Sequence, residues 1–349
     1  MSSQMTQGRS VSVVIPVLNG EKVMTHCLNS LLSQGRRPDE IIVVDNGSTD
    51  ETIPRVKQWI LAHPEVPLQL VTETKKGPSA TRNRGAQVAK GEILAFLDAD
   101  CETPVTWVRG LVEEIRGGAD AVGGACVIGT SAPAIEKYAA LSWFFKSEDI
   151  TLSLSSPFTH HYLLGANMAL RRECWEKIGG FDDIFQFSED MDLSFRIRQA
   201  GMKVKYLPNM TVAHQVSSFA WKRVRRAFCH GMMQSRIAQR NFRRRFVLSF
   251  LEKSVSCPFP ITATVESVSL LKILAILFFI GRMWPLGSFL ILMGLGVLWE
   301  LRMIQRFWSL RNSISVSECI LIPLGWALTR LSMEVGRLAG SVWYRVFCI

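Results

Sequence analysis

The sequence lacks any paired cysteine spacing, since its eight cysteines are scattered and none forms a CxxC motif. Disulfide frameworks and structural zinc sites normally show such pairs, so we expect reduced thiols in a cytosolic setting. The first ten residues, MSSQMTQGRS, contain no apolar core, and we therefore expect no signal peptide. Internal repeats and low-complexity tracts are also missing, which leaves no sign of a repeat protein.

Acidic residues are in short supply, with 30 aspartates and glutamates against 40 lysines and arginines and a net charge of +10. This balance suggests a phosphate-bearing partner: a nucleic acid, a nucleotide or an anionic lipid. Hydrophobic residues make up 48% of the 349 positions, and the mean hydropathy is +0.17. A chain this apolar is unusual for a soluble enzyme, so we expect one large domain with membrane segments attached.

Short apolar runs alternate with helical stretches through the first 120 residues or so. The pattern predicts an α/β fold with a mostly parallel sheet that helices cover on both faces. Polar residues follow each run, at the carboxyl edge where open α/β sheets bind ligands. Between 118 and about 215 the pattern is mixed, with a loop expected at 150–162. The expected strands are 11–18, 41–44, 68–72 and 93–97, and the expected helices lie near 21–34, 51–62, 78–90 and 104–116.

The chain changes character at Trp221. Residues 221–245 carry nine lysines or arginines and no acid, and apolar residues recur near helical spacing at Trp221, Val224, Phe228 and Met232. We predict an amphipathic helix whose cationic face lies on an anionic membrane surface. Nucleic-acid binding is the alternative, although few aromatic residues interleave this tract and apolar segments follow it directly.

Three apolar stretches follow the basic tract. Residues 262–281 contain Glu266 and Lys272, whereas residues 283–299 have no charge over 17 positions, about the length that crosses a hydrocarbon core. Basic residues on both outer sides of this pair predict a hairpin with both ends cytoplasmic. The shorter stretch 316–329 is expected to be interfacial or re-entrant. The alternative is that all three are buried helices of a second soluble domain.

Asp98-Ala99-Asp100 directly follows the expected strand 93–97. Alternation along an extended chain puts both carboxylates on one side, where their oxygens can hold a hard divalent cation. Such a cation would bridge a diphosphate and neutralise the charge that develops on a leaving group. Because this motif is common by chance, a pair of solvated turn aspartates is the alternative.

Two other loops combine polar residues with helix starts. In DNGSTD, after strand 41–44, Asp50 is expected to cap the next helix, while Asp45 could accept a hydrogen bond from a nucleotide base. The segment GPSATRNRG opens another helix, and its backbone amides and Arg82 could contact phosphate.

Ser188-Glu189-Asp190 begins another predicted helix. Acids in a first turn complement the helix dipole, which is sufficient reason for their presence. The alternative is that Asp190 is a general base that removes the proton of an acceptor hydroxyl. His214 is either structural, as most histidines beside small apolar residues are, or a further metal ligand.

The ordered set of these segments resembles the family 2 glycosyltransferases, which have a GT-A fold. The resemblance covers about residues 10–218, and although no single motif decides, the order is specific. It implies an inverting transfer of a sugar from a nucleotide-sugar donor in one displacement, with Mg²⁺ or Mn²⁺ and without a covalent intermediate. The matching segments are IPVLNG, VVDNGSTD, GPSATRNRG, FLDAD, LGANMALRR, GGFD, SEDMDLSFRIRQAG and VAH.

Carried over residue by residue, the resemblance implies a role for each matching position. Asp190 would be the catalytic base, and Asp100 would bind the metal, together with His214 as in some members. The residues implied in contact with the donor or lining its site are Pro16, Asn19, Glu21, Asp45, Arg82, Asp98, Gly165, Asn167 and Glu189.

The chain departs from the family pattern at one motif, which is linked to repeated addition of sugars. Processive members carry a QxxRW-type motif after the base, whereas this region reads CHGMMQSRIAQRNFRRRF. The chain therefore resembles an enzyme that adds one sugar. From the membrane segments we expect a lipid-linked saccharide of an envelope polysaccharide as acceptor. We also expect a location at the cell inner membrane with the catalytic domain in the cytoplasm, and no nucleic-acid partner.

The expected division is a tail at 1–9, a GT-A domain at 10–220, a basic interfacial region at 221–260 and membrane-associated helices at 261–349. Two other functions stay open. A polyprenyl-phosphate glycosyltransferase would use an already ionised lipid phosphate as nucleophile and would not need Asp190 as a base. A non-catalytic module would bind nucleotide-sugars or membranes without turnover.

Overall fold

A computed structural model of the chain shows two compact units. The first unit comprises Met1–Ala132, Trp143–Leu154 and His160–Ser217, and the second comprises Pro133–Ser142, Ser155–Thr159 and Ser218–Ile349. The finer division into four parts stays a prediction. The residues that the structure describes are 9–128, 150–151, 162–215, 221–241, 245–248, 253–256, 263–265, 316–344 and 347–348.

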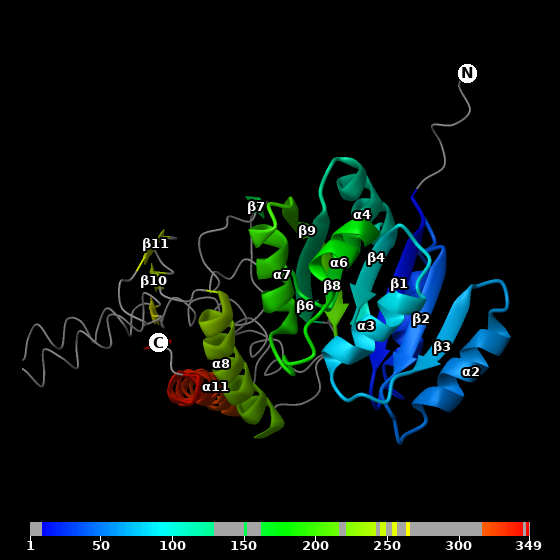
Figure 1. Ribbon diagram of the computed structural model, residues 1–349. Coiled ribbons are helices and arrows are strands. Elements are labelled where there is room, and N and C mark those ends of the chain that lie inside the picture. The colour runs from blue at the N-terminus through cyan, green and yellow to red at the C-terminus, as the bar shows by residue number, and fades with distance from the viewer. Residues whose placement is uncertain are drawn as a thin grey trace, which may run out of the picture. The chain divides into compact units, whose positions relative to one another are not determined.

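A nine-stranded sheet forms the centre of the first unit (Figure 1). Its order is β3-β2-β1-β4-β8-β6-β9-β5, with β7 paired to β9. The first four strands run parallel, whereas β8 is antiparallel to β4 and β6 is antiparallel to β8. The predicted parallel sheet is thus confirmed for its first half, and the whole sheet is mixed. The strands are β1 (Val11–Val17), β2 (Glu40–Asp45), β3 (Leu68–Thr72), β4 (Ile93–Leu97), β5 (Cys101–Glu102), β6 (Ala121–Ile128), β7 (Ile150–Thr151), β8 (Asn167–Arg171) and β9 (Val204–His214).

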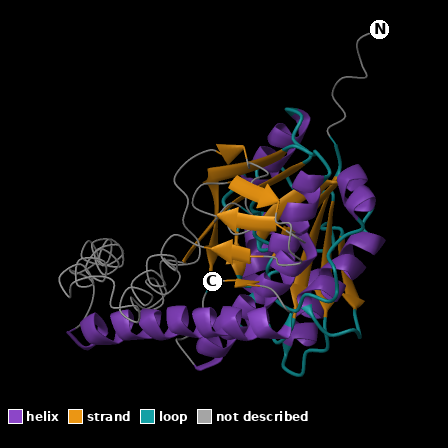
Figure 2. Ribbon diagram, turned by 60° about the vertical axis from the view of Figure 1, so that its left-hand side comes forward, coloured by secondary structure: helices purple, strands orange, loops and turns teal. Residues whose placement is uncertain are grey.

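The helices of this unit cover both faces of the sheet (Figure 2). Successive residues of β1 point to opposite faces, so Val13 and Ile15 join one buried cluster and Val14 joins the other. The first cluster contains residues of α1, α2 and α4, and the second contains residues of α3, α6 and α7. The prediction of strands buried on both sides is therefore confirmed. The helices are α1 (Met24–Leu32), α2 (Thr52–Ala62), α3 (Pro78–Val88), α4 (Trp107–Arg116), α6 (Arg172–Ile178) and α7 (Glu189–Gln199).

In the second unit, α8 (Trp221–Asn241) packs against α11 (Val316–Trp343). The helix predicted from Trp221 is confirmed, and Val224 and Ile237 on its apolar side are buried, whereas contact of its cationic face with a membrane stays a prediction. A small sheet in the order β11-β10-β12-β13 completes the unit. Its strands are β10 (Arg245–Leu248), β11 (Lys253–Ser256), β12 (Ala263–Val265) and β13 (Phe347–Cys348).

The predicted apolar stretches have different outcomes. The stretch 316–329 is the first half of α11, which continues to Trp343. The stretch 262–281 contains the strand β12 near its start, and its remainder, together with 283–299, lies outside the described residues. Among the helices that the structure describes, none combines the length and hydropathy needed to cross a membrane. Of the loop expected at 150–162, the first two residues form β7, and 152–161 lie outside the described residues.

The close packing of α3 on the sheet predicts a large effect of one methyl group. A Cβ added to Gly85 would lie 2.3 Å from Val14 Cγ1 and 3.1 Å from Val44 Cγ2. We expect Gly85→Ala to lower the free energy of unfolding by about 1–3 kcal/mol, because the core has no room for the methyl group. The thermal unfolding midpoint should fall by roughly 2–4 °C for each kcal/mol lost.

Gly110→Ala is the matched control. Gly110 also lies inside a helix, but the nearest atom to an added Cβ is Met210 Sδ at 3.6 Å. This substitution should leave the midpoint unchanged or raise it, since alanine favours the helix. Equal midpoints for the two variants would contradict the packing argument.

Candidate active site

A buried arginine connects two of the predicted acidic motifs. Arg82 of α3 is 4% exposed; its Nη1 donates to Glu189 Oε1 at 2.6 Å, and its Nη2 donates to Asp98 Oδ1 at 2.7 Å. Burial alone would lower the pKa of Arg82, but the charges of Asp98 and Glu189 raise it above its ordinary value. The guanidinium is therefore a permanent cation that joins the end of β4 to the start of α7.

Gly165 lies against this arginine and against the predicted base. A Cβ on Gly165 would lie 2.9 Å from Arg82 Cζ, so a larger residue would displace the guanidinium. The backbone N–H of Gly165 donates to Asp190 Oδ2 at 3.0 Å. The structure thus brings together five of the predicted site residues through direct contacts: Arg82, Asp98, Gly165, Glu189 and Asp190.

Asp190 lies in the first turn of α7, one residue after Glu189. Its Oδ1 also accepts a hydrogen bond from Met191 N at 2.8 Å. Burial, with the charge of Glu189 as a further cause, raises the pKa of Asp190 to about 7, against the opposing effects of the Gly165 hydrogen bond and Arg82. A carboxyl group with this pKa can take up and release a proton at neutral pH.

Tyr162 lies close to the same acids, and sequence analysis did not single it out. Burial and the negative charges of Asp190 and Glu189 raise the pKa of its phenol above the ordinary value. The phenol therefore stays protonated and can donate a hydrogen bond. Nothing in the spacing of the segment 150–162 marks this residue, because its proximity to α7 depends on the tertiary fold.

A second group of possible ligands lies where β5 pairs with β9. The antiparallel register places Cys101 opposite His214, and His214 Nε2 lies 3.3 Å from Asp100 Oδ1. Ligand atoms of Asp100, Cys101 and His214 all lie within 4.8 Å of one another. Carboxylate oxygen and imidazole nitrogen suit a divalent ion such as Mn²⁺. Burial raises the pKa of the Cys101 thiol well above its usual value, so the neutral thiol is a poor ligand, and Asp100 with His214 is the pair that fits.

The loop after β1 is attached to the loop after β2. Asn19, at φ 56°, accepts a hydrogen bond from Thr49 N at 2.9 Å, and Glu21 Oε2 accepts one from Glu51 N at 3.3 Å. Pro16 is half-buried near the end of β1. These three predicted donor-contacting residues therefore gather at the carboxyl edge of the sheet, where sequence analysis placed them.

Asp45 is 1% exposed and holds its own turn together. Its Oδ2 accepts hydrogen bonds from Gly47 N at 2.9 Å and from Ser48 N at 3.2 Å. Asp50 Oδ1 accepts from Thr52 N, at the first residue of α2, at 3.1 Å. Glu51 is the N-cap residue of α2 and makes no side-chain cap hydrogen bond, so Asp50 contacts the first helical N–H from the position before the cap. A contact of Asp45 with a nucleotide base stays a prediction.

Asn167 is fully buried, with its amide engaged inside the protein. Its Oδ1 accepts from Trp107 Nε1 at 2.8 Å, and its Nδ2 donates to Ala125 O at 2.9 Å and to Met210 O at 2.8 Å. These contacts give Asn167 a structural role between α4, β6 and β9. Its predicted contribution to the donor or acceptor region is therefore not supported by this geometry and stays a prediction.

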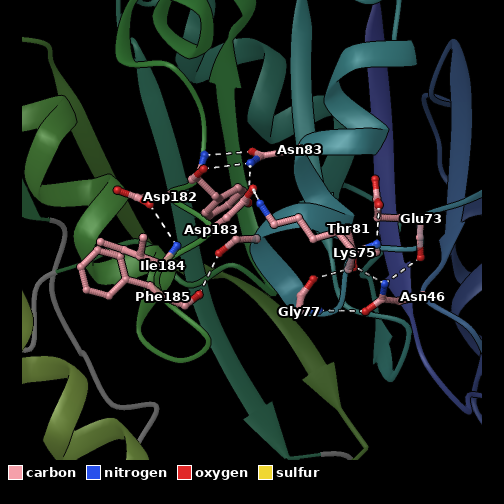
Figure 3. A network of polar contacts seen from close by, with 12 residues as sticks. Asn46, Glu73, Lys75, Gly77, Thr81, Asn83, Asp182, Asp183, Ile184 and Phe185 are labelled. Atoms are coloured by element: carbon pink, nitrogen blue, oxygen red, sulfur yellow. Dashed lines mark hydrogen bonds and ion pairs between the residues drawn. The ribbon is translucent and has the colours of Figure 1, made fainter.

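A network that sequence analysis missed holds the segment before α7 (Figure 3). Asn83 of α3 accepts from Phe181 N at 3.0 Å and donates to Phe181 O at 2.8 Å and to Asp183 Oδ1 at 3.1 Å. Ser79 Oγ donates to Phe185 O at 3.0 Å. The detectable signal is that Ser79 and Asn83 are one helical turn apart, on the side of α3 that also carries Arg82.

The same network reaches the loop after β2 (Figure 3). Asn46 Oδ1 accepts from Gly77 N at 3.0 Å, and its Nδ2 donates to Lys75 O at 2.8 Å. Lys75 Nζ in turn lies 2.6 Å from Asp183 Oδ2. Hydrogen bonds thus connect the predicted nucleotide loop to the segment that leads to Asp190.

Comparison with known proteins identifies the same region of the chain. Residues 12–179 match the family model described as Glycosyl transferase family 2. Glycosyltransferase AglE of Haloferax volcanii is 29% identical over 214 residues, which are 60% of this chain and 68% of that protein. The pre-mycofactocin glycosyltransferase of Mycobacterium tuberculosis is 28% identical over 59% of this chain, and the match spans only 43% of that relative.

A solved structure extends the likeness to the fold. The mannosyltransferase PcManGT from Pyrobaculum calidifontis, determined in complex with GDP-Man and Mn2+, aligns with 97% of this chain and 88% of its own, with a TM-score of 0.56 and 22% identity. This match, with the mixed sheet and its two layers of helices, shows a GT-A-like α/β fold. Residues 12–179 therefore form a glycosyl transferase family 2 domain, and its likeness to named glycosyltransferases supports transferase activity.

Proposed function

We propose that this glycosyltransferase moves one sugar from a nucleotide-sugar to an acceptor hydroxyl, with inversion at the anomeric carbon and Asp190 as the general base. The observation that carries the proposal is the environment of Asp190: a pKa raised to about 7, with Gly165 N–H orienting one carboxylate oxygen. A group with this pKa is an effective base near neutral pH. A lipid phosphate, by contrast, is already ionised and needs no base, so this geometry favours a hydroxyl acceptor.

In the proposed reaction, the Asp190 carboxylate accepts the proton of the acceptor hydroxyl as that oxygen bonds to the anomeric carbon. The bond between this carbon and the diphosphate oxygen breaks, and the nucleoside diphosphate leaves with the electron pair. Gly165 N–H holds the carboxylate in orientation, and Arg82 holds Glu189 beside it. Positioning of this kind supplies much of the rate enhancement in displacement reactions.

The nucleoside diphosphate develops negative charge as it leaves, and this charge must be neutralised. We propose that Asp100 and His214 hold a divalent ion, Mg²⁺ or Mn²⁺, which supports departure of the diphosphate when it is bound. We assign donor contacts to Asp98 and to the edge residues Pro16, Asn19, Glu21 and Asp45. Their common position at the carboxyl edge of the sheet supports this assignment.

The acceptor is proposed to be a lipid-linked saccharide of an envelope polysaccharide, at the cytoplasmic face of the cell inner membrane. The cationic tract 221–245 and the uncharged stretch 283–299 support a membrane site. The missing QxxRW motif supports addition of a single sugar. Transfer to a soluble acceptor in a detergent-free assay would count against this acceptor class.

The first prediction from this mechanism concerns the metal and the base. Nucleotide release is measured with purified protein in detergent, a panel of UDP-, GDP- and dTDP-sugars, Mn²⁺ or Mg²⁺, and a bacterial lipid extract. We expect one donor to release its nucleotide. This release should be abolished by EDTA and by the substitution Asp100→Ala. Asp190→Asn should lower kcat by about 10²-fold or more, because it removes the base while it keeps the shape.

Two outcomes would oppose this mechanism. Undiminished release by Asp190→Asn, with sugar recovered on a lipid phosphate, would favour the polyprenyl-phosphate reaction. Donor binding without turnover on any acceptor would support a non-catalytic module.

The second prediction concerns pH. Because Asp190 acts as a base only when ionised, kcat/KM should fall as the pH drops through about 7. Glu189→Gln removes a charge that raises the pKa of Asp190, so the acid limb of the profile should move to lower pH. The control is Glu113→Gln, an exposed position on α4, which should leave the profile unchanged. An unmoved acid limb in Glu189→Gln would argue against Asp190 as the titrating base.

The third prediction concerns the network around Asn83. Asn83→Ala removes three hydrogen bonds from the segment before α7, so Asp190 should lose its position while the donor loops keep theirs. We expect kcat to fall on the order of tenfold, with the donor KM little changed. Asn29→Ala is the control, because it removes one hydrogen bond to Trp59 Nε1 on α2 and none of this network. A similar loss of kcat in both variants would indicate a general loss of stability.

A further inference from the structure

Helices α8 and α11 pack along a seam of small residues. A Cβ on Gly231 would lie 2.1 Å from Met333 O, and one on Gly336 would lie 2.1 Å from Phe228 O. Glycines at such positions let two helix backbones approach very closely. The two helices therefore form one rigid pair, and the side of α8 that faces α11 is unavailable to any other partner.

The outer side of α11 carries an apolar stripe. Among the α11 side chains that the structure describes, every exposed one is apolar. Successive members from Leu328 to Val342 are three or four residues apart and so follow one side of the helix, and Trp343 lies next to Val342 at its end. A continuous apolar surface of this kind needs a cover. The apolar stripe consists of Leu328 (41% exposed), Leu331 (60%), Val335 (46%), Leu338 (53%), Val342 (82%) and Trp343 (76%).

Exposed arginines of α8 lie near both ends of this stripe. Ser332 Oγ donates to Val224 O at 2.8 Å, which brings the neighbouring Arg225 and Arg226 to the start of the apolar stripe. At the other end, Gln239 Nε2 donates to Tyr344 O at 2.6 Å, next to Arg240. All three arginines are exposed, and α8 contains no acidic residue.

We propose that the α8–α11 pair docks on an anionic lipid surface, with the apolar stripe of α11 in the acyl region and the arginines of α8 at the headgroups. Apolar side chains flanked by cations are complementary to such a surface. This inference rests on the proposed membrane association and deepens it, because it adds an apolar lipid contact through α11 to the contact predicted for the cationic face of α8.

A second copy of the chain is a poorer occupant of the apolar stripe. It would bring the arginines of two α8 helices together, and α8 offers no acid to pair with them. Glu334 is the one acid among the described side chains of α11, and it lies 3.7 Å from Arg337 of its own helix. Charge complementarity therefore favours lipid.

The test reads the environment of one position on the apolar stripe. A fluorescent probe is attached to Leu338→Cys in the full chain, and to Leu61→Cys on α2 as a control that is 82% exposed. Four other thiols are changed to serine, and the buried thiols Cys27, Cys101, Cys126 and Cys174 are kept. The substituted thiols are Cys229, Cys257, Cys319 and Cys348.

The labelled proteins are placed in phosphatidylcholine vesicles with or without phosphatidylglycerol, and with lipids that carry a quencher on the acyl chain. We expect quenching at position 338 to exceed that at position 61 at least about threefold in anionic vesicles, because apolar stripes enter the acyl boundary. Changing Arg225, Arg226 and Arg240 to glutamine should reduce the affinity for anionic vesicles on the order of a hundredfold at low salt. Each arginine is expected to raise this affinity about fivefold.

Equal quenching at positions 338 and 61 would overturn the proposal. Nearly complete formation of a disulfide-linked dimer by the unlabelled Leu338→Cys protein would also overturn it, because a second copy would then cover the apolar stripe. Nucleotide release is measured in detergent on the same protein preparations. Quenching without release would refute the proposed reaction and leave lipid docking intact, whereas release without quenching would refute only the docking.

Discussion

The first unit depends on keeping the buried guanidinium of Arg82 paired. An unpaired buried guanidinium would cost several kcal/mol, so Arg82 requires both of its carboxylate partners. Asp98 comes from the end of β4 and Glu189 from the start of α7, and meeting this requirement aligns the two elements. The same arrangement leaves room only for glycine at position 165, whose N–H orients Asp190. One set of contacts thus both stabilises the fold and orients the residues of the site.

The first half of the sheet is predictable from sequence because its strands are continuous apolar runs. The predicted strands 68–72 and 93–97 agree with β3 and β4 to the residue. The second half of the sheet is not predictable from sequence. Its strands β6, β8 and β9 pair in both parallel and antiparallel directions, and the mixed pattern of 118–215 does not specify which strands are neighbours. In the second unit, the spacing along α8 indicated an apolar face but could not show that α11 covers it.

The candidate site shows the same limit. Motif order identified the aspartates at 98, 100 and 190, because their residue types and positions after strands or at a helix start are local features. It could not show that the carboxylates of Asp98 and Glu189 share one arginine, since those contacts join residues 16 and 107 positions apart. Asn167 illustrates the converse, because a residue in a matching segment lies with its amide turned into the core.

The pairing of β5 with β9 has a consequence for biosynthesis. Asp100 and His214 are separated by 113 intervening positions along the chain, and β9 is the last strand that the large sheet acquires during synthesis. A nascent chain that has released only the residues up to α7 from the ribosome already contains every predicted donor contact and the base. It cannot yet bring the histidine to the aspartate. The metal site that we propose on these two residues therefore forms only after translation has passed β9.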